Sequence, residues 1–301
     1  MTHTTIFKAP ISIAAASLLL ALGLSSCKAS TSAESPTAET AIASNTLAPI
    51  RKTLSCLPPE AAIIAAHRGT DERWRDQAEN SIGGLNALIQ HGSLMAEIDV
   101  AGLRDDTLIT FHDGVWDEVS TVKGPISVSR KADLENILLK SRSGGLTADR
   151  PPLFADMLRA AKGKMYLEVD FKSSADPKDV IKAIRDADMA DQVLLIAYNA
   201  KQAALFERLA PDMLRSNPTD ATQAGHAVWL GYNVANGDTA KTLKSNSNYI
   251  IGRIGDPKRQ PPLKALRQAS DILVTDEAER YEGIIGLTAK GQAAYEACLS
   301  E

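Results

Sequence analysis

Apolar, β-branched runs recur along this chain with helical stretches between them, and this alternation constrains the fold more than any other feature. Helices with Pro at the start or Gly at the end fit between most of the runs. The alternation is typical of an α/β protein with a parallel sheet, and a single domain of about 220 residues with this pattern is most simply a (β/α)₈ TIM barrel. A doubly wound open sheet is the second choice, because no glycine-rich phosphate loop follows the first run. The runs span residues 61–67, 95–102, 107–113, 164–171, 192–199, 213–217, 227–233, 249–255 and 271–276.

The expected barrel is slightly irregular. Nine runs are one too many for eight strands, so we expect either 213–217 or 227–233 to be an extra element. The stretch between Asp99 and Leu108 is too short for a crossover helix, which predicts an extended link between the second and third strands. The long stretch 114–152 after the third strand is predicted to be an insertion, and such loops are usually functional or disordered.

The N-terminal sequence predicts that the protein is exported from the cytoplasm. Lys8 is followed by an apolar run that is too short to span a bilayer, so residues 1–26 are interpreted as a signal peptide. The tetrad "LSSC" resembles a bacterial lipoprotein box, which makes Cys27 the lipid-modified first residue of the mature chain. The alternative is a plain secretory site with Cys27 as a bystander. We expect a flexible tether at 27–55, rich in Ala, Ser and Thr, a folded domain at 56–301, and a lipid anchor in a membrane of the bacterial cell envelope.

Two further cysteines flank the expected barrel. Cys56 precedes the first strand and Cys298 lies near the C-terminus of a protein expected in an oxidising compartment. The start of the first strand and the end of the last helix of a closed barrel lie on the same rim, so a disulfide between them is reasonable. Two separate thiols are the equal alternative.

The charge pattern argues against two kinds of partner. The formal net charge is -4 at pH 7, and no cluster of like charge stands out. Nucleic acid and a polybasic membrane contact are therefore poor candidates.

Titratable residues end four consecutive runs, where an ordinary strand ends on apolar or turn residues. The chemistry of TIM barrels lies at these C-terminal strand ends. Side chains alternate along a strand, so the acidic groups of one strand share a face, and carboxylates facing a barrel interior repel one another unless a cation lies among them. Oxygen ligands suit Mg²⁺, Ca²⁺ or Mn²⁺, whereas the alternative is a set of ion pairs with Arg68 and Lys172. The residues are His67 and Arg68, then Glu97 and Asp99, then His112 and Asp113, then Glu168, Asp170 and Lys172.

Five short motifs resemble, in the same order, those of the glycerophosphodiester phosphodiesterase family. "AHRG", "AENS", "EIDV", "FHD" and "VDFK" are similar to its HRG, PENT, E-x-D, HD and E-x-K elements, and "DILVTDEAE" is similar to its final "DGIITDRP" strand. Each motif alone is weak, but their order on successive expected strands is specific over about residues 61–280. The resemblance implies a barrel that binds one divalent cation, Mg²⁺ or Ca²⁺ with Mn²⁺ as a third option. It also implies hydrolysis of glycerophosphodiesters to sn-glycerol 3-phosphate and an alcohol.

The resemblance also implies a role for each matching residue. His67 and His112 are the general acid and base, and the sequence does not indicate which histidine has which role. Arg68 holds a phosphate oxygen, and Lys172 assists at the phosphate. Two additional candidates have two interpretations each. Glu79 either approaches the metal or caps the next helix. Trp229 either forms a wall of the barrel mouth over the alcohol group of the substrate or only packs against its neighbours. Asn80 lines the same mouth. The implied metal ligands are Glu97, Asp99 and Asp170.

The chain departs from the family pattern at three places. Glu168, Asp170 and Lys172 stand where the family usually has Asn-x-Glu-x-Lys, so the third ligand is a shorter carboxylate with an additional acid two residues earlier. The loop before Glu79 lacks the usual proline and contains Trp74. "WDEVSTVKG" replaces the family's Arg-Thr-Thr after the second histidine.

Two other functions fit the same pattern. A phospholipase-type phosphodiesterase acting on intact lipid should expose an apolar rim around the site, and the sequence has no clear amphipathic membrane helix there. A non-catalytic lipoprotein that binds phosphoesters is the other, and the presence of both His67 and His112 argues against it. We expect a small glycerophosphodiester and a lipid bilayer as partners, and no nucleic acid.

Overall fold

The computed structural model describes residues 47–256, 258–287 and 289–301. The expected signal peptide, the lipidation site at Cys27 and most of the expected tether lie outside the described residues. Within the described part, no helix combines the length and apolar character needed to cross a membrane.

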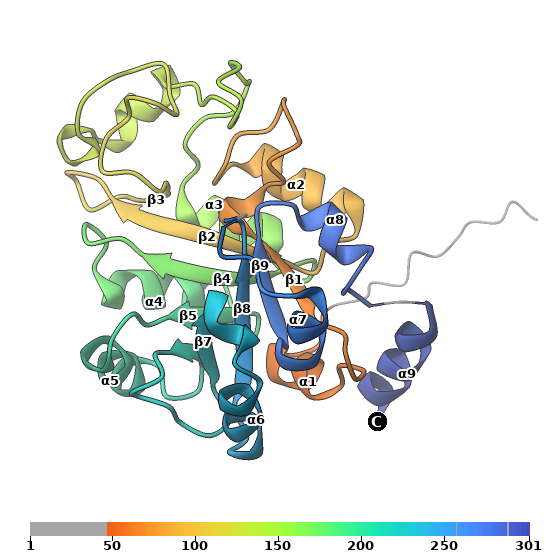
Figure 1. Ribbon diagram of the computed structural model, residues 1–301. Helices are drawn as coiled ribbons and strands as arrows, with labels where there is room; N and C mark the ends of the chain where they lie inside the picture. Colours follow the sequence, from red (N-terminus) through yellow and green to blue (C-terminus); the bar gives the residue numbers. More distant parts are fainter. Residues whose placement is uncertain (1–46, 257, 288) are drawn as a thin grey trace, which may run out of the picture. The chain divides into compact units, whose positions relative to one another are not determined.

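Eight parallel strands close into a barrel, which confirms the predicted (β/α)₈ fold (Figure 1). Each strand pairs with the next barrel strand in parallel, and β1 pairs with both β2 and β9, so the ring is complete. The barrel strands are β1 (Ile63–Ala66), β2 (Met95–Gly102), β4 (Tyr166–Phe171), β5 (Val193–Ile196), β6 (Leu214–Asn217), β7 (Ala227–Gly231), β8 (Tyr249–Ile254) and β9 (Ile272–Thr275).

The extra strand is β3 (Leu108–Thr110), and the expectation that it would be 213–217 or 227–233 is wrong. β3 runs antiparallel to the upper end of β2, with Thr110 opposite Val100. An antiparallel neighbour needs no crossover helix, which explains the short link after β2. β6 and β7 are both barrel strands, and the segment between them, 218–226, contains no helix although it is described throughout.

Helices cover the outside of the barrel (Figure 1). Several begin at a polar cap: the side chains of Ser81, Asp176 and Asn199 accept hydrogen bonds from backbone N–H groups in the first turn of α2, α4 and α5. Their apolar faces pack against the outward-facing strand residues in the largest buried cluster. The outer helices are α2 (Ile82–His91), α3 (Phe154–Ala161), α4 (Pro177–Asp186), α5 (Ala200–Leu209), α6 (Gly237–Ser245), α7 (Leu263–Ala269), α8 (Ala278–Glu282) and α9 (Ala289–Ser300), with 3₁₀ turns η1 (His67–Gly69), η2 (Ile126–Val128), η3 (Lys131–Asn136) and η4 (Tyr232–Ala235).

The barrel interior is apolar below and charged above, where the top means the C-terminal ends of the strands. Ile63, Met95 and Tyr166 point inward and belong to one buried apolar cluster. Because side chains alternate along a strand, the residues two and four positions after Met95 and Tyr166 also point inward, higher in the barrel. These residues are Glu97, Asp99, Glu168 and Asp170.

The bottom of the barrel is closed by α1 (Ile50–Ser55). Ile50 and Leu54 lie four residues apart on one helix face and are buried in the interior cluster. The Thr53 hydroxyl lies 2.6 Å from the Tyr166 hydroxyl. The predicted tether over 27–55 is therefore wrong for residues 50–55, because so short an apolar pair gives no periodic signal in a stretch rich in Ala, Ser and Thr.

Cys56 and Cys298 form a disulfide, with their Cα atoms 5.6 Å apart. Of the two alternatives left open by the sequence, the structure has the bonded one. The bond joins the end of α1 to α9 and so ties the bottom closure to the last helix.

The insertion (residues 114–152) is folded, and its apolar side chains form a buried cluster together with residues of β2 and β3. Trp116 is fully buried, and its ring lies 4.6 Å from that of Phe111. Ile126, Leu134 and Leu139 belong to the same buried cluster. The insertion is therefore an ordered element on top of the barrel.

Candidate active site

The first strand ends in a tight turn that aims two catalytic candidates at the barrel axis. Arg68 has a φ of 58° and Gly69 a φ of 65°, so the chain turns sharply directly after His67. The backbone N–H of Arg68 donates to Oε2 of Glu97 at 2.9 Å. The turn thus fixes the first and second strands of the site to each other.

Three buried carboxylates converge at the top of the barrel. Oxygen atoms of Glu97, Asp99 and Asp170 all lie within 4.8 Å of one another. Lys172 Nζ lies 2.7 Å from Asp99 Oδ1 and 2.8 Å from Asp170 Oδ2. The other oxygen of Asp170 is buried without a hydrogen-bond partner among the described residues. An all-oxygen donor set with an unpartnered atom fits a hard divalent cation such as Mg²⁺ or Ca²⁺.

The electrostatics of this cluster also fit a cation. Burial, followed by the charge of Asp99, raises the pKa of Glu97 well above its ordinary value. Burial acts to raise the pKa of Asp99 as well, but the Lys172 ammonium and the Asn80 amide outweigh it and hold that pKa below its ordinary value. Asn80 therefore supports Asp99, to which its amide donates at 2.7 Å. Full ionisation of all three acids needs more positive charge than Lys172 supplies.

Glu168 does not join the three converging carboxylates. It pairs in register with Glu97 on the neighbouring strand and lies one pleat below Asp170. It is fully buried, and neither of its oxygens has a hydrogen-bond partner in the described part of the chain. Burial, with the charge of Asp170, raises the pKa of Glu168 to about 8.

His67 is held between Asp276 and the acidic cluster. Its Nδ1 lies 2.6 Å from Asp276 Oδ1, and its Nε2 lies 3.9 Å from Glu97 Oε2. A carboxylate at 2.6 Å requires a proton between the two atoms, which we assign to Nδ1. Nε2 is then an unprotonated acceptor at the pocket. Burial lowers the pKa of His67 to about 4; the hydrogen bond to Asp276 opposes this shift and the charge of Arg253 adds to it.

His112 follows β3 and lines the same pocket as His67. Its Nδ1 lies 2.6 Å from Asp113 Oδ1, and its Nε2 lies 3.0 Å from Arg68 Nη2. Arg68 also donates through Nη1 to Glu79 at 2.9 Å. Glu79 thus pairs with Arg68, and it belongs neither to the converging carboxylates nor to the cap of α2, which is Ser81.

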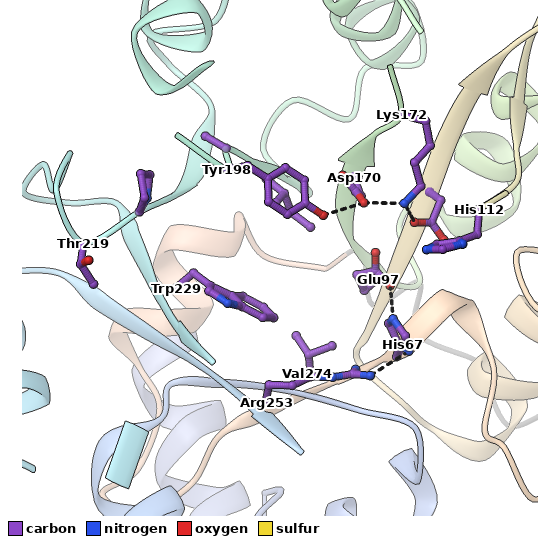
Figure 2. A pocket seen from close by; sticks show the side chains of 14 residues that line it. His67, Glu97, His112, Asp170, Lys172, Tyr198, Thr219, Trp229, Arg253 and Val274 are labelled. Carbon is purple, nitrogen blue, oxygen red and sulfur yellow. Dashed lines mark hydrogen bonds and ion pairs between the residues drawn. The ribbon is translucent and has the colours of Figure 1, made fainter. Parts of the chain in front are cut away.

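The two histidines, the three converging carboxylates and Lys172 line one pocket of about 330 Å³ (Figure 2). Figure 2 shows Trp229 and Tyr198 on one side and His67 and His112 on the other, with the carboxylates between them. Trp229 is 38% exposed and lines the pocket, and the Tyr198 hydroxyl donates to Asp170 at 2.8 Å. The remaining lining is mostly apolar and consists of Ile196, Ala197, Pro218, Thr219 and Val274, together with Arg253.

Four side chains of this site were not singled out from the sequence. Asp276 and Tyr198 end or nearly end two of the apolar runs, so the strand-end rule that found His67 applies to them equally. Arg253 shares its strand face with Ile251, which points inward. Arg142 lies in the insertion, where no periodic pattern indicates which side chain reaches the barrel.

The carboxylates, imidazoles and cations of this pocket can bind a metal, neutralise a phosphate and transfer protons. The profile of the Glycerophosphoryl diester phosphodiesterase family matches residues 67–250. This range includes most of the pocket residues and ends just after the start of β8.

Known proteins resemble this chain in sequence or in fold, at low sequence identity. The uncharacterized protein YqiK of Bacillus subtilis strain 168 is 24% identical over 245 residues, which cover 74% of this chain and 98% of that protein. A glycerophosphoryl diester phosphodiesterase from Parabacteroides distasonis superposes with a TM-score of 0.67 at 19% identity, over 82% of this chain and 96% of the other. A phosphodiesterase from Oleispira antarctica, solved in complex with the product sn-glycerol-3-phosphate, has a TM-score of 0.59 at 18% identity, over 81% and 99% of the two chains. Because the family profile matches more than half of the chain, this protein belongs to the glycerophosphoryl diester phosphodiesterase family and is an enzyme of the phosphoric diester hydrolase class.

Proposed function

We propose that this enzyme hydrolyses glycerophosphodiesters to sn-glycerol 3-phosphate and an alcohol, with one divalent cation and two histidines. The observation that carries the proposal is the convergence of Glu97, Asp99 and Asp170 in the pocket that His67 and His112 also line. Family membership and the product bound to the Oleispira antarctica structure support the same substrate class.

The three carboxylates would hold the cation, which when bound supplies positive charge to the phosphate as its bond breaks. Lys172 has an ammonium between Asp99 and Asp170, so it sets their positions and adds positive charge beside the phosphate. Arg68 reaches the phosphate by exchanging its bond to His112 for one to a phosphate oxygen. In this scheme that exchange also frees Nε2 of His112 for the substrate.

We assign His67 as the base and His112 as the acid. The Nδ1 proton of His67 is directed at Asp276, and two arginines close to the ring oppose a second proton on it. Its Nε2 therefore accepts a proton from the glycerol hydroxyl that attacks phosphorus, and water then opens the resulting cyclic phosphate to sn-glycerol 3-phosphate. Once Arg68 has left it, Nε2 of His112 binds a proton from solvent, and His112 donates this proton to the oxygen of the leaving alcohol.

The decisive experiment is turnover of glycerophosphocholine by the purified mature protein, before and after complete metal removal. We expect activity to disappear with a chelator and to return with Mg²⁺ or Ca²⁺. Full activity after metal removal would contradict the proposal that the reaction requires a divalent cation. No turnover on any of several glycerophosphodiesters would contradict the function, and binding of the substrates without turnover would favour the non-catalytic alternative.

We also propose that Cys27 carries a lipid that anchors the enzyme to a membrane of the bacterial cell envelope. The "LSSC" box supports this, and the disulfide between Cys56 and Cys298 is in keeping with an oxidising compartment. Expression in bacteria with labelled fatty acid should label the wild-type protein and leave Cys27→Ala unlabelled. Equal labelling of the two, or labelling of neither, would contradict the anchor.

A further inference from the structure

The insertion sends one arginine into the active site. Arg142 Nη1 donates to Asp276 Oδ1 at 2.6 Å, and its Nε lies 3.4 Å from Glu79 Oε2. Its Nη2 lies 3.4 Å from the His67 carbonyl oxygen and 3.3 Å from His67 Nδ1. Only 19% of the side chain is exposed, so these contacts are largely shielded from water.

Through these contacts Arg142 is connected to both histidines. On one side it binds Asp276, which holds Nδ1 of His67. On the other side it pairs with Glu79, which binds Arg68, and Arg68 contacts Nε2 of His112. The side chain thus bridges the two groups that orient the proposed base and the proposed acid.

The backbone around Arg142 is fixed to the barrel. Ser141 forms a β-bridge with Ala78, in the loop that follows β1. The N–H of Ser141 donates to the Gly145 carbonyl at 2.8 Å and the N–H of Gly144 donates to the Ser141 carbonyl at 2.8 Å, which closes a tight turn around Arg142. The position of the guanidinium is therefore set by backbone pairing as well as by its own ion pairs.

Arg253 and Arg142 contact the same two residues but differ in their relation to the pocket. Arg253 also contacts Asp276 and His67, through Nη2 at 2.9 Å and 3.0 Å. Arg253 lines the pocket, whereas Arg142 is not among the described residues that line it. Arg142 also pairs with Glu79. Its effect on the reaction must then pass through other residues.

We propose that Arg142 is a positioning residue that the insertion supplies. Through Asp276 it aligns His67, and through Glu79 it aligns Arg68, which contacts His112 in the protein without substrate and the phosphate when substrate is bound. The inference rests on the proposed function for its kinetic consequences, but the alignment itself is a property of the unliganded protein. A guanidinium is suited to this role because it donates to Asp276 in a fixed direction and keeps an ion pair with Glu79 at the same time, which a lysine does less well.

The kinetic test compares Arg142→Ala with Arg142→Lys and with Arg150→Ala. Arg150 lies in the same insertion, is exposed and donates to the backbone carbonyl of Glu135, so it is a matched control. We expect Arg142→Ala to lower kcat by about 10- to 100-fold, because misplaced catalytic groups cost roughly that much. KM should change by less than about threefold, because Arg142 does not line the pocket. Arg142→Lys should recover part of the loss, and Arg150→Ala should behave as wild type.

Added guanidinium provides a test that is independent of folding defects in a single variant. At millimolar concentration it should raise kcat of Arg142→Ala several-fold and leave Arg150→Ala unchanged. Normal kcat in Arg142→Ala, or a rise in KM that accounts for the whole loss, would overturn the proposal. So would a loss of kcat that neither lysine nor guanidinium recovers, because that indicates a structural role alone.

Imidazole ¹⁵N spectra distinguish a failure of this inference from a failure of the proposed function. In the wild type, His67 should give a protonated Nδ1 and an unprotonated Nε2, and both histidines should change in Arg142→Ala while neither changes in Arg150→Ala. Unchanged His67 and His112 signals in Arg142→Ala would contradict the positioning role whether or not glycerophosphodiesters are substrates. Changed signals in a protein without turnover would retain the positioning role and reject the proposed function.

Discussion

Asp276, at the end of the last barrel strand, binds Nδ1 of His67, at the end of the first, with 2.6 Å between the two atoms. The contact crosses the seam where β9 and β1 close the barrel, so the closure of the fold itself brings the pair together. Burial by itself would raise the pKa of the Asp276 carboxyl. The hydrogen bond from His67 and the nearby Arg253 and Arg142 outweigh burial and hold that pKa well below its ordinary value, so the carboxylate stays ionised.

Replacing Asp276 by Asn should lower kcat by about 100-fold or more, because the ionised acceptor that fixes the Nδ1 proton of His67 is lost. KM should change little, since Asp276 is not among the described residues that line the pocket. Steady-state kinetics at saturating cation measure both constants. The exposed carboxylate Asp105 provides the control, and Asp105→Asn should match wild type. A normal kcat in Asp276→Asn would reject the assignment of His67 as an oriented base.

The acid limb of the rate profile should lie well below the ordinary pKa of histidine. A base works when neutral, and burial shifts the pKa of His67 from 6.5 to about 4, so the neutral form persists as the pH falls to that value. At saturating cation, kcat/KM should therefore fall only as the pH approaches about 4 to 5. An inflection near pH 6.5 or above on the acid side would show that His67 is not the base, or that substrate removes its burial.

Strand positions and the polar strand ends could be predicted because each follows from a local pattern. All nine apolar runs are strands, and the converging carboxylates follow from the twofold alternation of side chains. The identity of the extra strand could not be read in this way. β3 has three residues and β6 has four, and the sequence does not indicate that β3 pairs antiparallel with its neighbour whereas β6 pairs in parallel. The contact of Arg142 with Asp276 joins residues 134 positions apart through an insertion without periodicity, so only the folded chain reveals it.

Removal of the disulfide should destabilise the protein without affecting catalysis. The bond closes a loop of 242 residues and restricts the unfolded chain, so Cys56→Ser with Cys298→Ser should lower the free energy of unfolding by about 2 to 5 kcal/mol. Both cysteines lie at the bottom of the barrel, away from the pocket, so kcat at 25 °C should stay within about twofold of wild type. Denaturant unfolding with and without a reducing agent measures the first effect. The reducing agent should destabilise the wild type and leave the double variant unchanged. Equal destabilisation of both proteins by the reducing agent would show that the disulfide is not the source of the difference in stability.

Glu168 and Asp170 should respond differently to removal of their charge, although they lie two residues apart on one strand face. Burial and the charge of Asp170 raise the pKa of Glu168 to about 8, so at pH 7 Glu168 is mostly protonated and Glu168→Gln exchanges one neutral group for another. Mg²⁺ affinity measured by calorimetry should then change by less than about threefold at pH 7. Asp170→Asn removes one of the converging carboxylates and should weaken Mg²⁺ binding by about tenfold or more at the same pH.

The same pair predicts a pH dependence with a definite sign. Above pH 8 Glu168 ionises and adds negative charge beneath the cluster, so wild type should bind Mg²⁺ more tightly at pH 9 than at pH 7, and Glu168→Gln should show a smaller increase. A large loss of affinity in Glu168→Gln already at pH 7 would mean that this carboxylate is ionised in the folded protein. The acid that stands where the family usually has asparagine would then add its charge beneath the three converging carboxylates and strengthen cation binding at neutral pH.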